Sequence, residues 1–285
     1  MKRNALKSLF VVSSALVASS FAQANVQSHY ERLGGIHKIA AYVDRSVEAQ
    51  AADPLLMTNQ NNMTVMKLAG KPAIKFFLTM ELAHLSGGPE QYGGPDCGSV
   101  LAWINFTPEQ KERMMALDMK AMADTGFSAE VQKELGALFQ KQFMMAKKGW
   151  MPKPEPMKDK KSLYARLGGI VAISAVVDEF VNQLGADPVI GSNPHTVKAL
   201  TDGHMSVPGL KTLVTQQLAE AAGGPWKYAG RSMAKSHQGL GISEKEWEVG
   251  AGILKRVLDK FHVPAKEQAE VLTVISSTKK DIVGK

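Results

Sequence analysis

The sequence predicts an all-α protein built from two tandem copies of one helical domain. Apolar residues recur at spacings of three and four, with few of the β-branched alternations that strands show. A set of short motifs also occurs twice in the same order. The 285 residues, 45% hydrophobic and 21% charged, suit two domains of roughly 100–150 residues each. This composition excludes a disordered or disulfide-rich chain.

The N-terminal segment predicts a secretory signal peptide over residues 1–24. Three basic residues precede an apolar stretch over 9–21, which ends in Ala22-Gln23-Ala24. The stretch is too short to cross a bilayer, so we expect cleavage after Ala24, a periplasmic or secreted protein, and no membrane span afterwards. Cleavage lowers the net charge from +7 to +4, because the segment holds three of the 34 basic residues and no acid. The remaining charges are scattered, and we expect no nucleic-acid partner.

The repeat defines the expected domain boundaries. Residues 30–36 (YERLGGI) match residues 164–170 (YARLGGI), and 52–54 (ADP) match 186–188 at the same offset of 134. The sequence GGP at 87–89 matches 223–225 at an offset of 136. Between the copies, three prolines at alternate positions favour an extended spacer. We therefore expect a first domain over 25–148, a Pro/Lys-rich linker over 149–161 and a second domain over 162–285.

Each copy is expected to hold four main helices and short pieces. Two apolar faces in the second copy predict two of them: Ile170, Ile173, Val176, Val177 and Phe180, then Leu210, Leu213, Val214 and Leu218. Hydroxyl caps followed by acids predict helix starts at Thr107 and Ser243. A last helix starts at Val263-Pro264 and is expected to carry apolar residues as far as Ile282. The Gly-Gly pairs fall between helices, where a left-handed backbone is needed.

Cys97 is the only cysteine of the chain. A lone thiol excludes an intramolecular disulfide, a covalent haem attachment motif, an iron–sulfur cluster and a cysteine-based zinc site. We expect it to be a buried small hydrophobic residue, because free cysteine is usually interior.

His237 stands in a segment, residues 228–242, that follows the second GGP break. A histidine on a short amphipathic segment is more often a packed or surface residue than a ligand. It has no His, Asp or Glu partner at the spacing that a zinc pair on one helix needs. If it binds a metal, the other ligands must come from elsewhere.

Nearly all of residues 162–284 resemble the truncated (2/2) haemoglobins, most closely group I. The matching features are the opening LYARLGG, Phe180, ADP, GGP and the pattern Tyr228-x-Gly230-x-x-Met233-x-x-x-His237-x-x-x-x-Ile242. The resemblance implies a truncated-globin fold for both copies and one non-covalent haem b per chain in the second. It also implies that His237 is the proximal iron ligand, in a pocket that includes Met233.

The resemblance also implies a distal pocket formed by Phe180, Val181, Leu210 and Val214, and a diatomic gas (O2, NO or CO) as ligand. Family members commonly have Tyr where Val181 stands and Gln where Val214 stands, so the usual hydrogen-bond donors are missing. The pocket should therefore stabilise iron-bound carbon monoxide or nitric oxide better than iron-bound oxygen. Nitric oxide dioxygenation and peroxidase chemistry lose support, and whether the protein is an enzyme stays open. The sequence identifies no redox partner.

His195 and His204 precede the helix that carries Leu210, and either is a candidate sixth iron ligand. The competing interpretation, a solvated loop histidine, is favoured because loop lengths do not fix where these side chains point.

The first copy lacks the ligand, because Leu101 stands at the place of His237 and Cys97 at that of Met233. We expect no conventional haem there and a pocket filled by methionines, with Met115, Met119 and Met122 as a helical stripe. A Cu(I) site of thioethers and thiol is the alternative for this copy. For the whole chain, the alternative is a haem-free helical binding module for an apolar ligand, copper or a protein partner.

Overall fold

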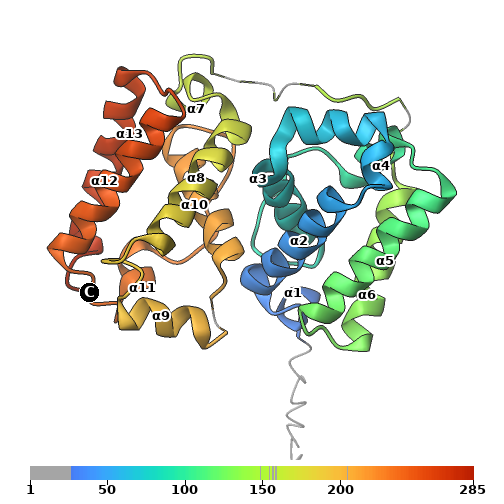
Figure 1. Cartoon of the computed structure of the whole chain (residues 1–285), viewed down its shortest axis with the longest axis horizontal. Helices are drawn as coiled ribbons and strands as arrows, with labels where there is room; N and C mark the ends of the chain where they lie inside the picture. Colours follow the sequence, from blue (N-terminus) through green and yellow to red (C-terminus); the bar gives the residue numbers. More distant parts are fainter. Residues whose placement is uncertain (1–26, 148, 154, 156, 158, 204) are drawn as a thin grey trace, which may run out of the picture.

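The structure, a computed structural model, describes residues 27–285 except 148, 154, 156, 158 and 204. The signal-peptide prediction for residues 1–24 falls outside this range. Over the described residues the chain is helical and has no strands, which confirms the all-α fold class (Figure 1). We call residues 27–147 the first half and residues 159–285 the second half.

Four long helices form the body of each half. The first half contains α1 (His29–Arg32), α2 (Gly35–Ala52), η1 (Leu56–Thr58), α3 (Gln60–Leu85), α4 (Cys97–Ile104), α5 (Pro108–Asp124) and α6 (Ala129–Met144). The second half contains α7 (Leu163–Arg166), α8 (Gly169–Ala186), α9 (Pro194–Thr201), α10 (Val207–Ala221), α11 (Met233–His237), α12 (Glu244–Lys260), α13 (Ala265–Ser277) and η2 (Lys279–Asp281).

Local signals in the sequence account for the helix ends. Thr107 and Ser243 both close capping boxes, with the hydroxyl accepting from the backbone N–H three residues on. Gly34 and Gly168 have φ of 78° and 93° and separate the first short helix of each half from the long one that follows. One boundary differs from the expectation, since α13 ends at Ser277 and leaves Ile282 outside the helix.

Equivalent hydrogen bonds recur in the two halves. Asn59 caps α3, and its side-chain amide donates to Gln110 Oε1 at 3.3 Å. Asn193, 134 residues later, caps α9 and donates to Glu246 Oε1 at 2.7 Å. Gly70 has φ 70° and breaks α3 internally, so the part of α3 before it corresponds to α9 and the part after it to α10.

The two halves pack against each other through the first two long helices of each half. Helix α2 lies against α10, and α3 lies against α8 (Figure 1). Phe76 and Met80 of α3 belong to the buried core of the second half. The Phe76 ring meets the Trp226 ring edge-on, with centroids 5.0 Å apart. The hydrophobic core is therefore continuous from one half to the other.

Beside this interface, each half contains an equivalent lysine–aspartate contact between two of its own helices. Lys75 Nζ lies 2.6 Å from Asp44 Oδ1, and Lys211 Nζ lies 2.7 Å from Asp178 Oδ1. At the edge of the interface, Gly209 sits against His37, where a Cβ atom would overlap the imidazole. The interface therefore requires the absence of a side chain at this position.

Helix α8 is the one helix of the described chain that is long and apolar enough to cross a membrane, judged by length and composition alone. It packs against α3, α10 and α12, and seven of its residues are buried. Its apolar surface therefore has partners within this fold.

Phe76→Ala should lower the free energy of unfolding by about 3–5 kcal/mol, because the ring is 2% exposed and its removal leaves a cavity in a core shared by both halves. Urea denaturation followed by circular dichroism measures this loss. The matched control is Met144→Ala, whose side chain is 75% exposed and should cost no more than about 0.5 kcal/mol. A loss below about 1 kcal/mol for Phe76→Ala would contradict the shared core.

Candidate functional site

The short helix α11 fixes the orientation of His237. Ser232 caps its N-terminus by accepting a hydrogen bond from the Lys235 backbone N–H. His237 Nδ1 lies 2.9 Å from the carbonyl oxygen of Met233, one turn earlier. A carbonyl oxygen can only accept, so Nδ1 carries the proton and Nε2 keeps its lone pair. This is the arrangement in which a backbone acceptor fixes the tautomer of a metal-binding histidine.

The C-terminal residues hold the loop that follows α11. Gly241 N–H donates to the carbonyl oxygen of Lys285 at 3.0 Å, and Gly284 N–H donates to that of Ile242 at 2.9 Å. Helix α11 also contacts η2. The position of His237 therefore depends on the last residues of the chain, which the sequence did not indicate.

The four residues expected to form the distal wall share one apolar cluster. Val181 is 5% exposed in the core of the second half, and Phe180, Leu210 and Val214 pack against that core while remaining partly exposed. None of these side chains carries a polar atom. Met233 and His237 are also partly exposed, so the imidazole is neither fully buried nor free on the surface.

Nearby polar side chains of α10 are already engaged. Thr212 Oγ1 donates to the Pro208 carbonyl at 3.0 Å. Gln216 is fully buried, donates to the Lys227 carbonyl and accepts from Ala229 N–H. These groups hold the backbone rather than offering donors to a ligand.

His195 is not brought to the distal wall. His195 is exposed in the first turn of α9, and its ring lies beside Gly241. His204 lies outside the described residues. The structure thus places His195 where a solvated histidine is expected and gives it no role as a ligand.

No group of three or more His, Cys, Asp or Glu residues is arranged to hold a metal ion in the part of the chain that the structure describes. A metal at His237 would therefore need ligands supplied by a cofactor. A porphyrin supplies four nitrogens and asks the protein for an axial ligand and an apolar pocket. The oriented imidazole of α11 and the apolar side chains of α8 and α10 are the kinds of group that such a cofactor needs.

The equivalent position in the first half has different chemistry. Leu101 takes the place of His237 on α4, and Cys97 takes that of Met233. Burial, reinforced by the carboxylate of Glu81, raises the pKa of the Cys97 thiol far above its ordinary value. The thiol stays protonated, which suits a packed residue and weakens the case for a thiolate copper site.

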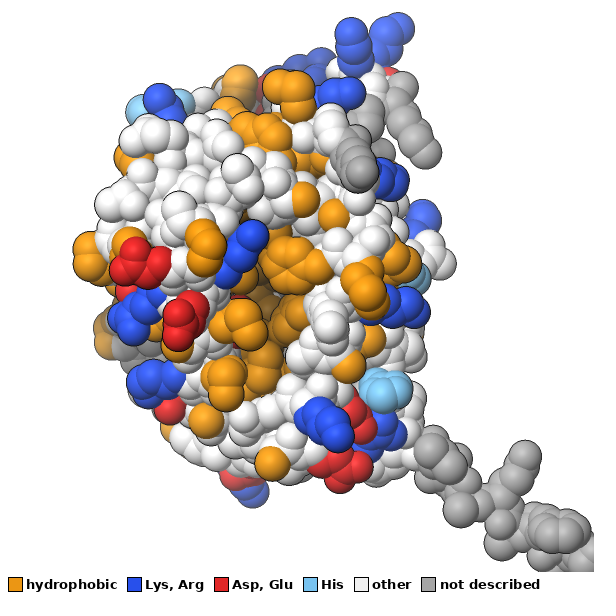
Figure 2. Space-filling model, turned by 90° about the vertical axis from the view of Figure 1, so that its right-hand side faces the viewer, with side chains coloured by type: hydrophobic (Ala, Val, Ile, Leu, Met, Phe, Trp, Pro, Cys, Tyr) orange, Lys and Arg blue, Asp and Glu red, His pale blue; other side chains and the backbone are white. Residues whose placement is uncertain are grey.

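A cavity of about 1600 Å³ lies mainly in the first half, between α2, α3, α4, α5 and α6. Residues 149–153 and Glu155, with Val171 and Trp226 of the second half, also line it. Figure 2 shows its mouth as a hollow surrounded by hydrophobic side chains. The expectation that methionines fill this pocket is wrong. Met122 is buried, but Met115 and Met119 are 59% and 61% exposed, and all three line the cavity. The opposite wall on α6 includes Gly136, where a Cβ atom would meet nothing within 4 Å.

A polar cluster interrupts the wall of this cavity. Asp118 Oδ1 accepts hydrogen bonds from Ser46 Oγ at 2.5 Å and from Gln50 Nε2 at 3.0 Å. Burial raises the pKa of Asp118 to about 6 and that of Glu81 to about 7. This cluster was not predicted from the sequence. The signal for it was the position of Asp118, an acid on the same face of α5 as Met115 and Met122.

Comparison with known proteins identifies the class. The model of the bacterial-like globin family matches residues 162–283. A group 1 truncated hemoglobin of Mycolicibacterium paratuberculosis is 32% identical over 115 residues, which cover 40% of this chain and 79% of that protein. A group 1 truncated hemoglobin of Chlamydomonas moewusii is 30% identical over 124 residues, which cover 43% of this chain and 68% of that protein. The crystal structure of truncated hemoglobin from Tetrahymena pyriformis, in its Fe(III) form, is 26% identical in sequence. The match covers 44% of this chain and 100% of that chain, with a TM-score of 0.39.

The all-α fold and the family match define a globin. More narrowly, the chain belongs to the truncated haemoglobin family. Membership of a globin family implies haem as cofactor.

Asp118→Asn should change how stability depends on pH. A carboxyl group whose pKa is raised in the folded state holds its proton longer there, so wild-type stability should fall as the pH rises from about 4 to about 6. In Asp118→Asn this decrease of stability with pH should be absent. In Glu81→Gln the corresponding decrease, which should extend to about pH 7 in the wild type, should be absent. Urea midpoints at each pH measure the difference.

Asp124→Asn is the control, because this carboxylate lies on the same helix but its side chain is 49% exposed. It should keep the wild-type profile. Parallel profiles for wild type and Asp118→Asn would show that Asp118 has no raised pKa in the folded protein.

Proposed function

We propose that the second domain, residues 162–285, binds one haem b through His237 and takes up a diatomic gas. The observation that carries this is the hydrogen bond between His237 Nδ1 and the Met233 carbonyl, which leaves Nε2 free as a ligand. It lies within the residues that the bacterial-like globin model matches. When bound, haem supplies an iron centre for a gas such as O2, NO or CO.

The other residues have supporting roles in this proposal. Val181, Leu210 and Val214 exclude water from the ligand side of the pocket, and Phe180 packs beside them. Because these side chains donate no hydrogen bond, the pocket stabilises oxygen poorly and suits carbon monoxide or nitric oxide better. The distal wall also holds no acid–base pair, so the proposal is gas binding rather than a catalysed reaction.

The first domain, residues 25–148, is proposed to be a copy of the same fold without the iron ligand, joined by the linker over 149–161. The recurrent contacts of Asn59 and Asn193 support the duplication. So do the equivalent lysine–aspartate contacts of Lys75 and Lys211. We further propose that residues 1–24 direct export to the periplasm or the medium, on the sequence pattern alone.

His237→Ala should abolish stoichiometric haem binding, because no other histidine of the second half that the structure describes has its ring oriented by a backbone acceptor. Titration with haemin, followed by the Soret absorbance, measures this in the wild type and the variant. Added imidazole should restore a bound-haem spectrum if the pocket is intact.

His195→Ala is the matched control and should bind haemin as the wild type does, since its ring is exposed beside Gly241. Retention of one tightly bound haem in His237→Ala would refute the assignment.

Val181→Tyr should slow oxygen dissociation about tenfold, because a neutral hydrogen bond contributes about 1 kcal/mol or slightly more. Stopped-flow displacement of oxygen measures the rate. Val181→Phe adds the same ring without the hydroxyl and should stay within about threefold of wild type, a margin that corresponds to under 1 kcal/mol. Equal slowing in both variants would point to ring bulk rather than a missing donor.

A further inference from the structure

Several residues that line the first-half cavity stand at positions equivalent to the proposed distal wall of the second half. Val47, Ile74 and Leu78 line it, and they stand 134 or 136 residues before Val181, Leu210 and Val214. The iron ligand is missing, because Leu101 also lines the cavity where a histidine would be needed. The cavity therefore keeps the position of a globin pocket but cannot use the same cofactor chemistry.

The size and lining of the cavity favour a ligand with a long apolar body. Its volume of about 1600 Å³ exceeds the roughly 300–1,000 Å³ of typical small-molecule sites. Its walls are mainly aliphatic, aromatic and thioether side chains, among them Val65, Phe77, Phe106 and Phe139. Methionines at the mouth are adaptable and accommodate apolar molecules of varied shape. An apolar chain would bury its surface here.

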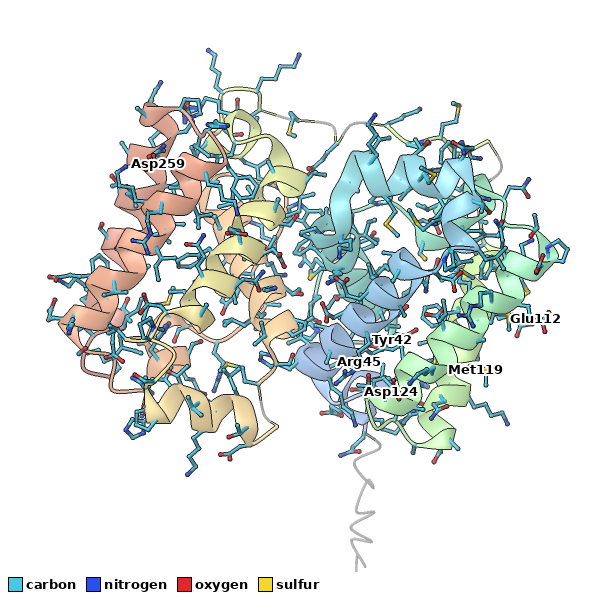
Figure 3. The ribbon with its side chains drawn as sticks, viewed as in Figure 1. Tyr42, Arg45, Glu112, Met119, Asp124 and Asp259 are labelled. Atoms are coloured by element: carbon cyan, nitrogen blue, oxygen red, sulfur yellow. The ribbon has the colours of Figure 1, made fainter. Side chains whose placement is uncertain are left out.

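Asp118 supplies a charged anchor in this apolar wall. Ser46 and Gln50 both donate to the same oxygen, Oδ1. Tyr42 stands beside the carboxyl and is 2% exposed, so this cluster lies at the inner side of the cavity (Figure 3 labels Tyr42 on α2 and Met119 on α5). With a pKa of about 6, Asp118 is mainly ionised at pH 7.5. A carboxylate in such surroundings favours a cationic hydrogen-bond donor.

The other charged groups of the cavity do not serve as that donor. Lys133 and Lys153 are the only cationic side chains among the described residues that line it, and both are exposed. Glu81 accepts from the Cys97 backbone N–H, and Glu155 accepts from Tyr164 and from the Ile170 N–H. The interior therefore carries carboxylates and no cation, which disfavours an anionic head group.

We propose that the first-half cavity binds an elongated apolar molecule with an amine head group, with the ammonium paired to Asp118. Free fatty acids and other apolar anions are the ligands that this electrostatic arrangement excludes. The site goes beyond haem and gas binding in the second half and does not depend on it. The same binding is therefore expected in the His237→Ala variant.

The test uses three probes with the same ten-carbon chain: decylamine, 1-decanol and decanoate. Isothermal titration calorimetry at pH 7.5, on the full chain loaded with haem, reports one site per chain for each probe that binds. Decylamine should bind at least tenfold more tightly than 1-decanol, and decanoate should bind most weakly. Equal or tighter binding of decanoate, or no binding of any probe, would overturn the proposal.

Two pairs of variants locate the site. Asp118→Asn should weaken decylamine binding at least tenfold and leave 1-decanol unchanged, whereas Asp124→Asn should alter neither. Gly136→Phe should abolish binding of all three probes, because its side chain enters the open space of the cavity. Gly185→Phe is the control, since this glycine also has free space around its Cβ but lies on α8 outside the cavity lining.

Circular dichroism melts of each variant distinguish loss of the site from loss of the fold. An unchanged preference for the amine in folded Asp118→Asn, or unchanged binding in folded Gly136→Phe, would also overturn the proposal. Loss of haem in His237→Ala with decylamine binding intact would support both assignments independently.

Discussion

The packing of α2 and α3 against α10 and α8 is the constraint on which the rest of the structure depends. Each of these four helices must present one face to the other half and another face to its own core. Phe76 shows the consequence, since it belongs to α3 but is buried with Trp226 of the second half. Close approach of Gly209 to His37 and the hydrogen bond from Ser206 Oγ to the His37 carbonyl oxygen also join the two halves. The remaining helices of the first half then enclose the cavity whose wall includes Asp118.

The two halves differ chiefly in what their short helices α4 and α11 offer to a cofactor. In the second half, α11 presents an imidazole whose Nδ1 is held by the Met233 carbonyl. In the first half, α4 presents Leu101, and its N-terminal residue Cys97 keeps its thiol proton. The first half, which has Leu101 at the position of His237, holds an apolar cavity with a carboxyl group at Asp118. This combination favours a different class of ligand.

The sequence predicted the helical fold and the capping at Thr107 and Ser243, because these features depend on residues within a few positions of each other. Helical periodicity placed Phe180, Leu210 and Val214 on apolar faces, and the resemblance to truncated haemoglobins grouped them with Val181. The sequence did not predict the cavity. Met115 and Met119 have the same spacing whether they fill a core or line an opening, and only the separation of α5 from α3 and α4 decides between the two.

We propose that the two halves are copies of one fold and that the first half lacks the axial iron ligand of the second. Leu101→His tests it directly, since the new imidazole would stand four residues after Cys97, as His237 stands after Met233. Haemin titration with quantification of bound haem per chain is the measurement. The account predicts one haem in the wild type and two in the variant. A folded Leu101→His protein that still binds one haem would contradict the equivalence of the two pockets.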